Sequence, residues 1–149
     1  RRQRQMCIRD RGNFDINDCS TQRNLNDTGR EQARAWKPFL ADHGITEARV
    51  FSSQWCRCMD TATGMDMGEV TEWPSLNSFF RNRGDGPTQT RQTITLVNQL
   101  EEGAPVIMVS HQVNITSLTG IFPSSNEGAI IALPLSEDPT VLARVSPGR

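Results

Sequence analysis

The sequence predicts an α/β fold with three layers, α/β/α, built around a largely parallel sheet. Three observations favour this class. From residue 27 onward, stretches of good helix formers alternate with short apolar runs, the order expected when each strand is followed by a crossover helix. The run Val106–Val109 is apolar without a break, as in strands covered on both faces. A length of 149 residues corresponds to one domain and can bury a core.

The composition excludes some classes of function. Hydrophobic residues make up 36% of the chain and charged residues 22%, and no apolar run is long enough to span a bilayer. Residues 1–11 hold five of the 16 basic residues and one of the 17 acidic residues, so the remainder carries 11 basic and 16 acidic side chains, a net charge of −5. An acidic body argues against nucleic acid as a partner.

Residues 1–11 differ from the rest of the chain. Within them, residues 6–10 (Met-Cys-Ile-Arg-Asp) correspond to the translation of a sequencing-library adapter, ATG TGT ATA AGA GAC. A basic arm that contacts a polyanion is the alternative interpretation. We favour a non-native arm, followed by a single domain over residues 12–149. Because this arm is too short and too basic for a buried parallel strand, we expect the first strand of the sheet to be missing.

A polar loop over residues 12–25 precedes the first predicted helix. Either Asn26 or Asp27 can cap this helix. Pro38 should weaken or bend its middle, and Gly44 suits the position just after its last turn. We expect His43, beside that glycine, to be solvated.

The strand predicted next, over residues 49–53, leads into a second helix. Ser53 is the predicted N-cap, which places Arg57 in the first or second helical turn. Cations are disfavoured near a helix N-terminus, so this arginine needs a partner. A bound anion is one candidate, and an ion pair with Asp60 or Asp18 is the other.

The remaining elements follow from turn residues and periodicity. Residues 68–76 form a predicted edge strand, because Pro74 cannot donate to a ladder. A loop over residues 77–87 precedes a helix over residues 88–102, and a turn spans residues 123–127. Two closing strands, residues 129–135 and 140–145, form a predicted hairpin.

His111 follows the buried strand Val106–Val109 and precedes a short helix that Gly120 closes. In open α/β sheets, ligands bind at the carboxyl ends of the strands, and a helix N-terminus there favours an anion, phosphate above all. His111 is therefore a candidate anion ligand. The alternative is a histidine that only bonds a backbone carbonyl at a strand end.

Residues 23–135 resemble the histidine phosphatase superfamily, also called phosphoglycerate-mutase-like. Three short motifs carry the resemblance, in the family's order and spacing: Arg23-Asn24-Leu25 with Gly29 and Gln32-Ala33, Val50-Phe51-Ser52-Ser53 with Arg57 and Thr61-Ala62, and the strand that ends in His111. Residues 128–130 with Leu133 also fit the family's closing strand. Each motif alone is weak, whereas three in order are a strong signal.

The resemblance implies a phosphatase that hydrolyses a small phosphomonoester through a phosphohistidine intermediate, with no cofactor. Arg57 and His111 would be the catalytic residues that grip the phosphoryl oxygens. The implied phosphate- or substrate-binding residues are Arg23, Ser78, Gln112 and Asn114. A mutase is disfavoured, because the insertions that bind a sugar phosphate have no room in this chain.

Two departures from the family pattern matter. The R-H-G motif that supplies the nucleophile is absent, since the chain's two histidines are His43 and His111 and neither follows a first strand. We therefore expect the chain as given to be inactive. Ser78 stands where many members carry a glutamate as general acid, and Glu72 lies too early. A non-catalytic phospho-ligand-binding domain and a plain structural domain are the alternatives.

Three of the four cysteines raise a different possibility, a metal site formed by Cys19, Cys56, Cys58 and His111. Cys-x-Cys lacks the usual ligand spacing and no second pair exists, so we expect no metal. Cys19 and Cys56 both flank the predicted pocket. They can pair in an oxidising compartment or remain thiols, and the sequence leaves both states open.

Overall fold

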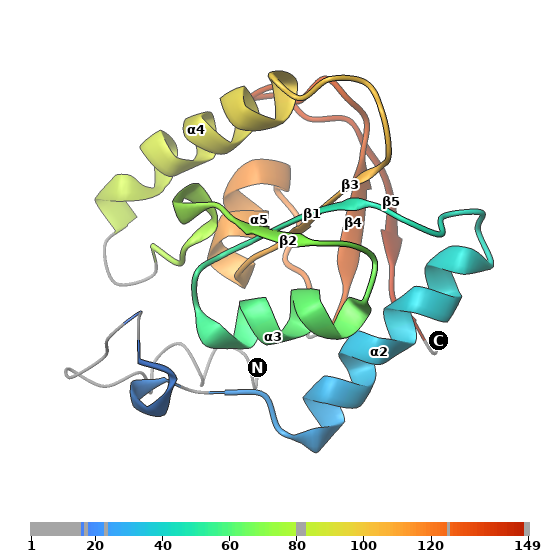
Figure 1. Cartoon of the computed structure of the whole chain (residues 1–149). Coiled ribbons are helices and arrows are strands. Elements are labelled where there is room, and N and C mark those ends of the chain that lie inside the picture. Colours follow the sequence, from blue (N-terminus) through green and yellow to red (C-terminus); the bar gives the residue numbers. More distant parts are fainter. Residues whose placement is uncertain (1–15, 17, 23, 80–82, 125, 148–149) are drawn as a thin grey trace.

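The structure is a computed structural model that describes residues 16, 18–22, 24–79, 83–124 and 126–147. Its centre is a three-stranded parallel sheet in the order β2-β1-β3 (Figure 1). The strands are β1 (Arg49–Ser52), β2 (Val70–Glu72) and β3 (Val106–Val109). The predicted α/β class with a largely parallel sheet is therefore confirmed.

Helices cover both faces of this sheet. Figure 1 shows α2 (Asp27–Ala41) and α3 (Cys56–Met65) on one side, and α4 (Gly86–Asn98) and α5 (Gln112–Thr119) on the other. These are the three layers that the alternation of helices and strands predicts. Short 3₁₀ helices, η1 (Cys19–Thr21), η2 (Pro74–Leu76) and η3 (Arg83–Asp85), lie in the connections.

The main core lies between β1, α2 and α3. Its buried members are Ala48, Val50, Ala62, Met65 and Met67. A fully buried Val or Met side chain contributes about 1.5–3 kcal/mol, so this cluster holds α3 firmly against β1. As a result, the first turn of α3 is fixed beside the carboxyl end of β1.

The N-terminus of α2 shows which of two candidate caps is used. The Asn26 side chain accepts a hydrogen bond from the Gly29 N–H at 2.8 Å, and the helix begins at Asp27. Pro38 lies inside the helix, which continues to Ala41. Gly44 follows the last turn with φ +82°, a left-handed conformation that favours glycine.

The predicted cap of α3 is wrong. The residue at the N-cap position is Trp55, which makes no side-chain cap bond. Ser53 lies two residues earlier, and its hydroxyl oxygen accepts from the Trp55 N–H at 3.2 Å while it also contacts His111 and Asn77. The Ser53 hydroxyl is thus occupied by tertiary contacts with His111 and Asn77 and does not cap the helix. Arg57 still lies in the first turn, as predicted.

Two element boundaries also differ from the prediction. The edge strand spans Val70–Glu72 rather than residues 68–76, because Pro74 starts the 3₁₀ helix η2. In the part of the chain that the structure describes, it lies at the edge of the sheet, as predicted. Helix α4 spans residues 86–98 rather than 88–102, with Pro87 in the first turn, where a missing N–H costs nothing.

The predicted hairpin is present as β4 (Gly128–Ile131) and β5 (Val141–Val145), an antiparallel pair. The first of these strands is shorter than predicted. Within the described residues this pair forms a separate two-stranded sheet. No helix in this part of the chain is long and apolar enough to cross a membrane.

Strand β3 is less buried than its sequence predicts. All four of its residues are half-buried, because among the described residues β1 is its strand neighbour on one side and no strand pairs with the other. The predicted arm over residues 1–11 and Arg23 lie outside the described residues.

Candidate functional site

The carboxyl ends of β1 and β3 meet at one edge of the sheet. Ser52 pairs with Val109, and the Ser53 N–H donates to the Val109 carbonyl at 2.9 Å. Parallel strands end on the same side, so the segments after them emerge together. His111, the N-cap residue of α5, therefore lies beside the first turn of α3.

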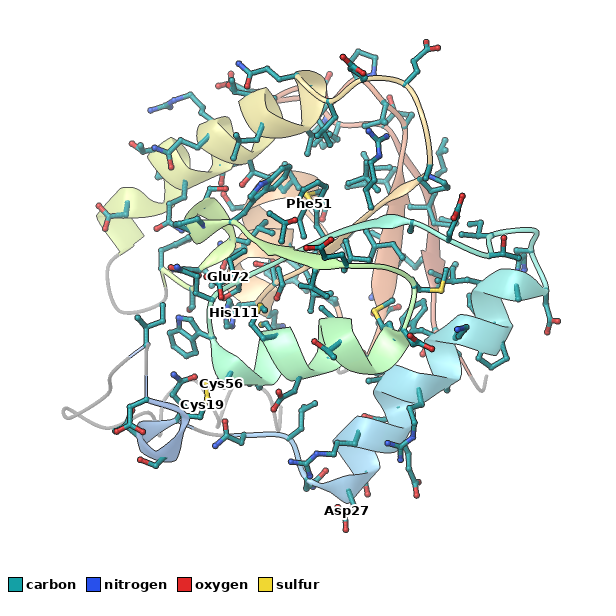
Figure 2. The ribbon with its side chains drawn as sticks, viewed as in Figure 1. Cys19, Asp27, Phe51, Cys56, Glu72 and His111 are labelled. Carbon is teal, nitrogen blue, oxygen red and sulfur yellow. A yellow bond between two sulfur atoms is a disulfide. The ribbon has the colours of Figure 1, made fainter. Side chains whose placement is uncertain are left out.

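His111 is completely buried at this edge, with 0% of its surface exposed (Figure 2). Its Nε2 lies 2.9 Å from the Ser53 hydroxyl oxygen, and its Nδ1 lies 3.4 Å from Nη2 of Arg57. Burial, and secondly the positive charge of Arg57, hold the pKa of His111 well below its ordinary value of 6.5. The imidazole is therefore neutral, and its ring contacts are side chains rather than the backbone carbonyl considered as an alternative.

Arg57 is also buried, with 5% of its surface exposed. Its guanidinium carbon lies 4.6 Å from the centre of the Trp55 ring, in cation–π geometry. The same indole ring meets the His111 ring at 4.7 Å in an edge-on arrangement. Arg57, Trp55 and His111 thus form one packed cluster that brings together the two predicted catalytic residues.

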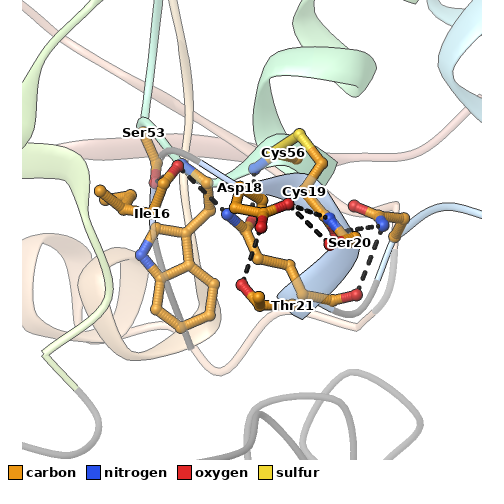
Figure 3. The surroundings of a disulfide bond; sticks show 10 residues. Ile16, Asp18, Cys19, Ser20, Thr21, Ser53 and Cys56 are labelled. Carbon is orange, nitrogen blue, oxygen red and sulfur yellow. Dashed lines mark hydrogen bonds between the residues drawn. A yellow bond between two sulfur atoms is a disulfide. The ribbon is translucent and has the colours of Figure 1, made fainter. Parts of the chain in front are cut away.

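A disulfide joins Cys19 of η1 to Cys56, the first residue of α3, with a Cα–Cα distance of 5.7 Å (Figure 3). Of the two states that the sequence leaves open for this pair, the structure contains the bonded one. Cys58 keeps its thiol, and its Sγ lies 3.6 Å from Nε2 of His111. Within the described residues, no group of His, Cys, Asp or Glu side chains is arranged to hold a metal ion.

A second contact holds η1 to α3. The Gln22 side-chain oxygen accepts from the Cys56 N–H at 2.8 Å, and the Gln22 amide nitrogen donates to the Ile16 carbonyl at 3.2 Å. This buried glutamine satisfies one of the N–H groups that a helix N-terminus leaves unpaired. Sequence reasoning missed it, because no local pattern links residue 22 to residue 56.

Asn77 was also missed, and its side chain binds the segment that follows β1. Its side-chain oxygen accepts from the Ser53 hydroxyl at 3.1 Å and from the Gln54 N–H at 2.8 Å. Its amide nitrogen donates to the Gln54 side-chain oxygen at 2.9 Å. The one available signal was its position beside Ser78, in the segment that the family comparison singled out.

Asn114 is held close to the same network. Its amide nitrogen donates to the Asn77 carbonyl at 2.8 Å, whereas its buried Oδ1 has no hydrogen-bond partner among the described residues. Gln112 is half-buried and lies 3.5 Å from the Pro123 carbonyl. Its described contact is thus with the turn that follows α5 rather than with Arg57 or His111.

Ser78, at the position of the family's general acid, and Glu72, the glutamate that precedes it, lie in different places. Ser78 is half-buried next to Asn77, and Glu72 is exposed at the end of β2, where it accepts from the Gln54 side chain at 3.4 Å. Two surface depressions of about 270 and 310 Å³ lie elsewhere, on α2 and α3 and beside the hairpin. The Arg57–His111 cluster is closed in this structure.

Comparison with solved structures supports the fold. The chain is similar to the protein histidine phosphatase SixA solved with tungstate, with 22% identity over 84% of this chain and 85% of that one and a TM-score of 0.62. A Mycobacterium tuberculosis protein, Rv3214, gives 16% identity, coverages of 85% and 86% and a TM-score of 0.58. An Entamoeba histolytica phosphoserine phosphatase mutant solved with phosphoserine gives 14% identity, coverages of 81% of this chain and 83% of that one, and a TM-score of 0.56.

These identities establish a shared fold and nothing finer. A comparison with curated protein sequences found no match. The sequence profile of the histidine phosphatase superfamily (branch 1) matches residues 18–93, which is half of the chain and includes β1, both cysteines of the disulfide and Arg57. This match supports a phosphatase-type function. It establishes that the chain belongs to the histidine phosphatase superfamily.

Proposed function

We propose that the cluster binds the phosphoryl group of a small phosphomonoester, with Arg57 and His111 as the gripping residues. The observation that carries this proposal is the meeting of the two side chains. They come from different elements, both are at least nine-tenths buried, and their nitrogen atoms lie 3.4 Å apart. Fixed donors in a buried site stabilise developing negative charge without reorganising.

The reaction class that the family resemblance implies is phosphomonoester hydrolysis in two transfers, and it requires a nucleophilic histidine that this sequence lacks. In the first, a histidine nitrogen attacks phosphorus, the bond to the ester oxygen breaks, and the alcohol leaves with a proton. In the second, water attacks the phosphohistidine and releases inorganic phosphate and the histidine. Arg57 would neutralise charge on the non-bridging oxygens in both steps. Asn114 would bind a phosphoryl oxygen through the second N–H of its amide, since its Oδ1 can only accept.

Neither of the chain's two histidines is suited to the first transfer. His43 is exposed beyond the end of α2, where its Nδ1 lies 2.9 Å from the Phe39 carbonyl. His111 is the second pocket histidine by resemblance, and both its ring nitrogens already have side-chain neighbours. We therefore propose that this chain binds the phosphoryl group without turning it over. The roles of Arg23, Ser78 and Gln112 as further ligands remain part of the same proposal.

Binding requires a local rearrangement. His111 has no exposed surface, and Trp55 lies against both its ring and the Arg57 guanidinium. An anion that contacts both residues must displace the indole and accept from a protonated ring nitrogen of His111. We expect the fluorescence of the protein to change on binding, since tryptophan emission responds to such a movement.

The test is a titration with inorganic phosphate and with vanadate, followed by calorimetry and fluorescence. A hydrogen bond to a charged group contributes about 1.5–3 kcal/mol, so Arg57→Ala should weaken binding by at least about tenfold. Arg91→Ala is the matched control, because Arg91 is exposed on α4. Equal affinities for wild type and Arg57→Ala would refute the site.

The absence of turnover is tested separately with p-nitrophenyl phosphate. We expect this chain to release no nitrophenol. Hydrolysis that His111→Gln abolishes would contradict the binding-only part of the proposal and would identify His111 as a nucleophile.

A further inference from the structure

The hydrogen-bond partners of Asn77 fix the orientation of its side-chain amide. The Oδ1 atom accepts from the Gln54 backbone N–H at 2.8 Å, and the Nδ2 atom donates to the Gln54 side-chain oxygen at 2.9 Å. With this orientation, the atom that faces the Ser53 hydroxyl at 3.1 Å is Oδ1. An amide oxygen can only accept, so Ser53 donates its proton to Asn77.

The donation by Ser53 determines what the hydroxyl can do toward His111. A serine hydroxyl has one proton and two lone pairs. Once the proton points to Asn77, the oxygen accepts, and one of its lone pairs receives the Trp55 N–H at 3.2 Å. The other faces Nε2 of His111 at 2.9 Å. Nε2 must therefore carry the imidazole proton.

The second ring nitrogen supports the same assignment independently. Nδ1 lies 3.4 Å from Nη2 of Arg57, and a guanidinium has donors only. A proton on Nδ1 would set two N–H groups against each other. Nδ1 therefore presents its lone pair to Arg57, and the neutral ring keeps its single proton on Nε2. The Cys58 sulfur, 3.6 Å from Nε2, makes at most a weak contact.

We propose that Asn77 is a positioning residue: acting through the Ser53 hydroxyl, it holds His111 in the tautomer with Nε2 protonated and the Nδ1 lone pair toward Arg57. Its role in binding rests on the function proposed above. We call the chain of contacts from Asn77 through Ser53 to His111 the relay. By keeping Nδ1 an acceptor, the relay holds the guanidinium against the imidazole at the carboxyl ends of β1 and β3. The segment after β2 thus controls a pair that belongs to α3 and α5.

The tautomer can be read by nuclear magnetic resonance of the whole chain labelled with ¹⁵N-histidine, because protonated and unprotonated ring nitrogens give separate signals. His43→Gln assigns the His111 signals. We expect Nε2 to be protonated in the wild type. In Asn77→Ala the Ser53 hydroxyl is released to donate to Nε2, in competition with the Arg57 donor at Nδ1, so a fraction of the molecules should carry the proton on Nδ1. Asn77→Asp keeps an acceptor oxygen and should retain the wild-type tautomer.

Asn98→Ala is the matched control. The Asn98 side chain bonds the Leu135 backbone at both its amide atoms, so this variant removes an equivalent amide elsewhere. It should leave the His111 tautomer unchanged. Protonation of Nδ1 in the wild type, or an unchanged tautomer in folded Asn77→Ala, would overturn the proposal. If Asn77→Ala does not fold, Ser53→Ala decides, since it removes the acceptor of the Nε2 proton and should leave both tautomers populated.

A phosphate titration of the same variants separates this proposal from the proposed function. We expect Asn77→Ala to bind phosphate about tenfold more weakly than wild type, which corresponds to ~1.4 kcal/mol. If the wild type binds no phosphate while Asn77→Ala still shifts the tautomer, the proposed function fails and the relay stands. If the tautomer shifts and phosphate affinity does not, the role of Asn77 in binding is refuted.

Discussion

His111 illustrates how burial at a single residue sets both charge and stability. The ring sits in the interior, with the Arg57 guanidinium at Nδ1 and the Cys58 thiol near Nε2. Protonation would place a second positive charge beside the first in a medium that solvates neither. The folded protein therefore resists protonation of His111, whereas the unfolded chain does not.

This difference predicts a pH dependence of stability. Because the folded pKa of His111 lies well below 6.5, the unfolded state binds an extra proton once the pH falls below that value. The free energy of unfolding should then decrease by up to about 1.4 kcal/mol per pH unit, and this residue should contribute no slope above about pH 7. Denaturant unfolding of the whole chain from about pH 5 to 8 measures it.

The control for this slope is the other histidine. His111→Gln should abolish the slope between about pH 5 and 6.5, and His43→Gln, which replaces an exposed ring, should retain it. Asp18 and Asp66 have pKa values lowered by hydrogen bonds to Ser20 and Lys37, so their effect falls below about pH 4. A slope that survives His111→Gln would show that another group causes it.

At the residue scale, the sequence predicted side chains that directly follow strands and missed those held by tertiary contacts. Arg57 and His111 could be predicted, because each stands a short distance after an apolar run in the sequence. Asn77 and Gln22 were not, because their partners lie 23 to 37 residues away and no periodicity encodes those pairings. Ser53 was assigned the wrong role for the same reason, since Asn77 and His111 occupy its hydroxyl.

At the scale of elements, the disulfide joins η1 to α3 at the turn that carries Arg57. The bond closes a loop of 37 residues that includes all of α2 and β1. The chain-entropy relation gives about 4 kcal/mol for a loop of this length. The disulfide therefore contributes a large part of the stability of a domain this small.

Reduction should lower both the stability and the phosphate affinity. We expect dithiothreitol to decrease the free energy of unfolding by up to about 4 kcal/mol and to weaken phosphate binding, because Gln22 then loses its fixed position at the Cys56 N–H. The double variant Cys19→Ala, Cys56→Ala is the control: it retains Cys7 and Cys58 and should show no further response to dithiothreitol. A response that persists in the double variant would assign the effect to one of these two remaining cysteines.

Element boundaries show the limits of the sequence at this scale. The order of helices and strands and the hairpin were predictable from alternation and turn residues, because these depend on local patterns. The lengths were not: Pro74 ends the edge strand early, and β3 is half-buried although its run is wholly apolar. The burial of a strand depends on which segments pack beside it, and the strand's own apolar sequence does not reveal those neighbours.

At the scale of the whole molecule, the described residues form two sheets rather than one (Figure 1). Among the described residues, β3 and β4 each have a strand neighbour on one side only. Unpaired strand edges favour association with other chains. The apolar side chains that are most exposed among the described residues also lie in or near the β4–β5 hairpin: Phe122, Ile130, Leu133 and Leu142, which are 72%, 46%, 60% and 62% exposed.

These features predict concentration-dependent self-association that a charge on the hairpin should reduce. Leu142→Lys removes one of the most exposed apolar groups and should change the free energy of unfolding by less than about 0.5 kcal/mol, because the site is exposed. Light scattering over a range of protein concentrations should then show a smaller mean mass than for wild type. Thr95→Lys adds the same charge at an exposed position of α4 and should leave the mass unchanged. Equal masses for wild type and Leu142→Lys would show that the hairpin does not drive association.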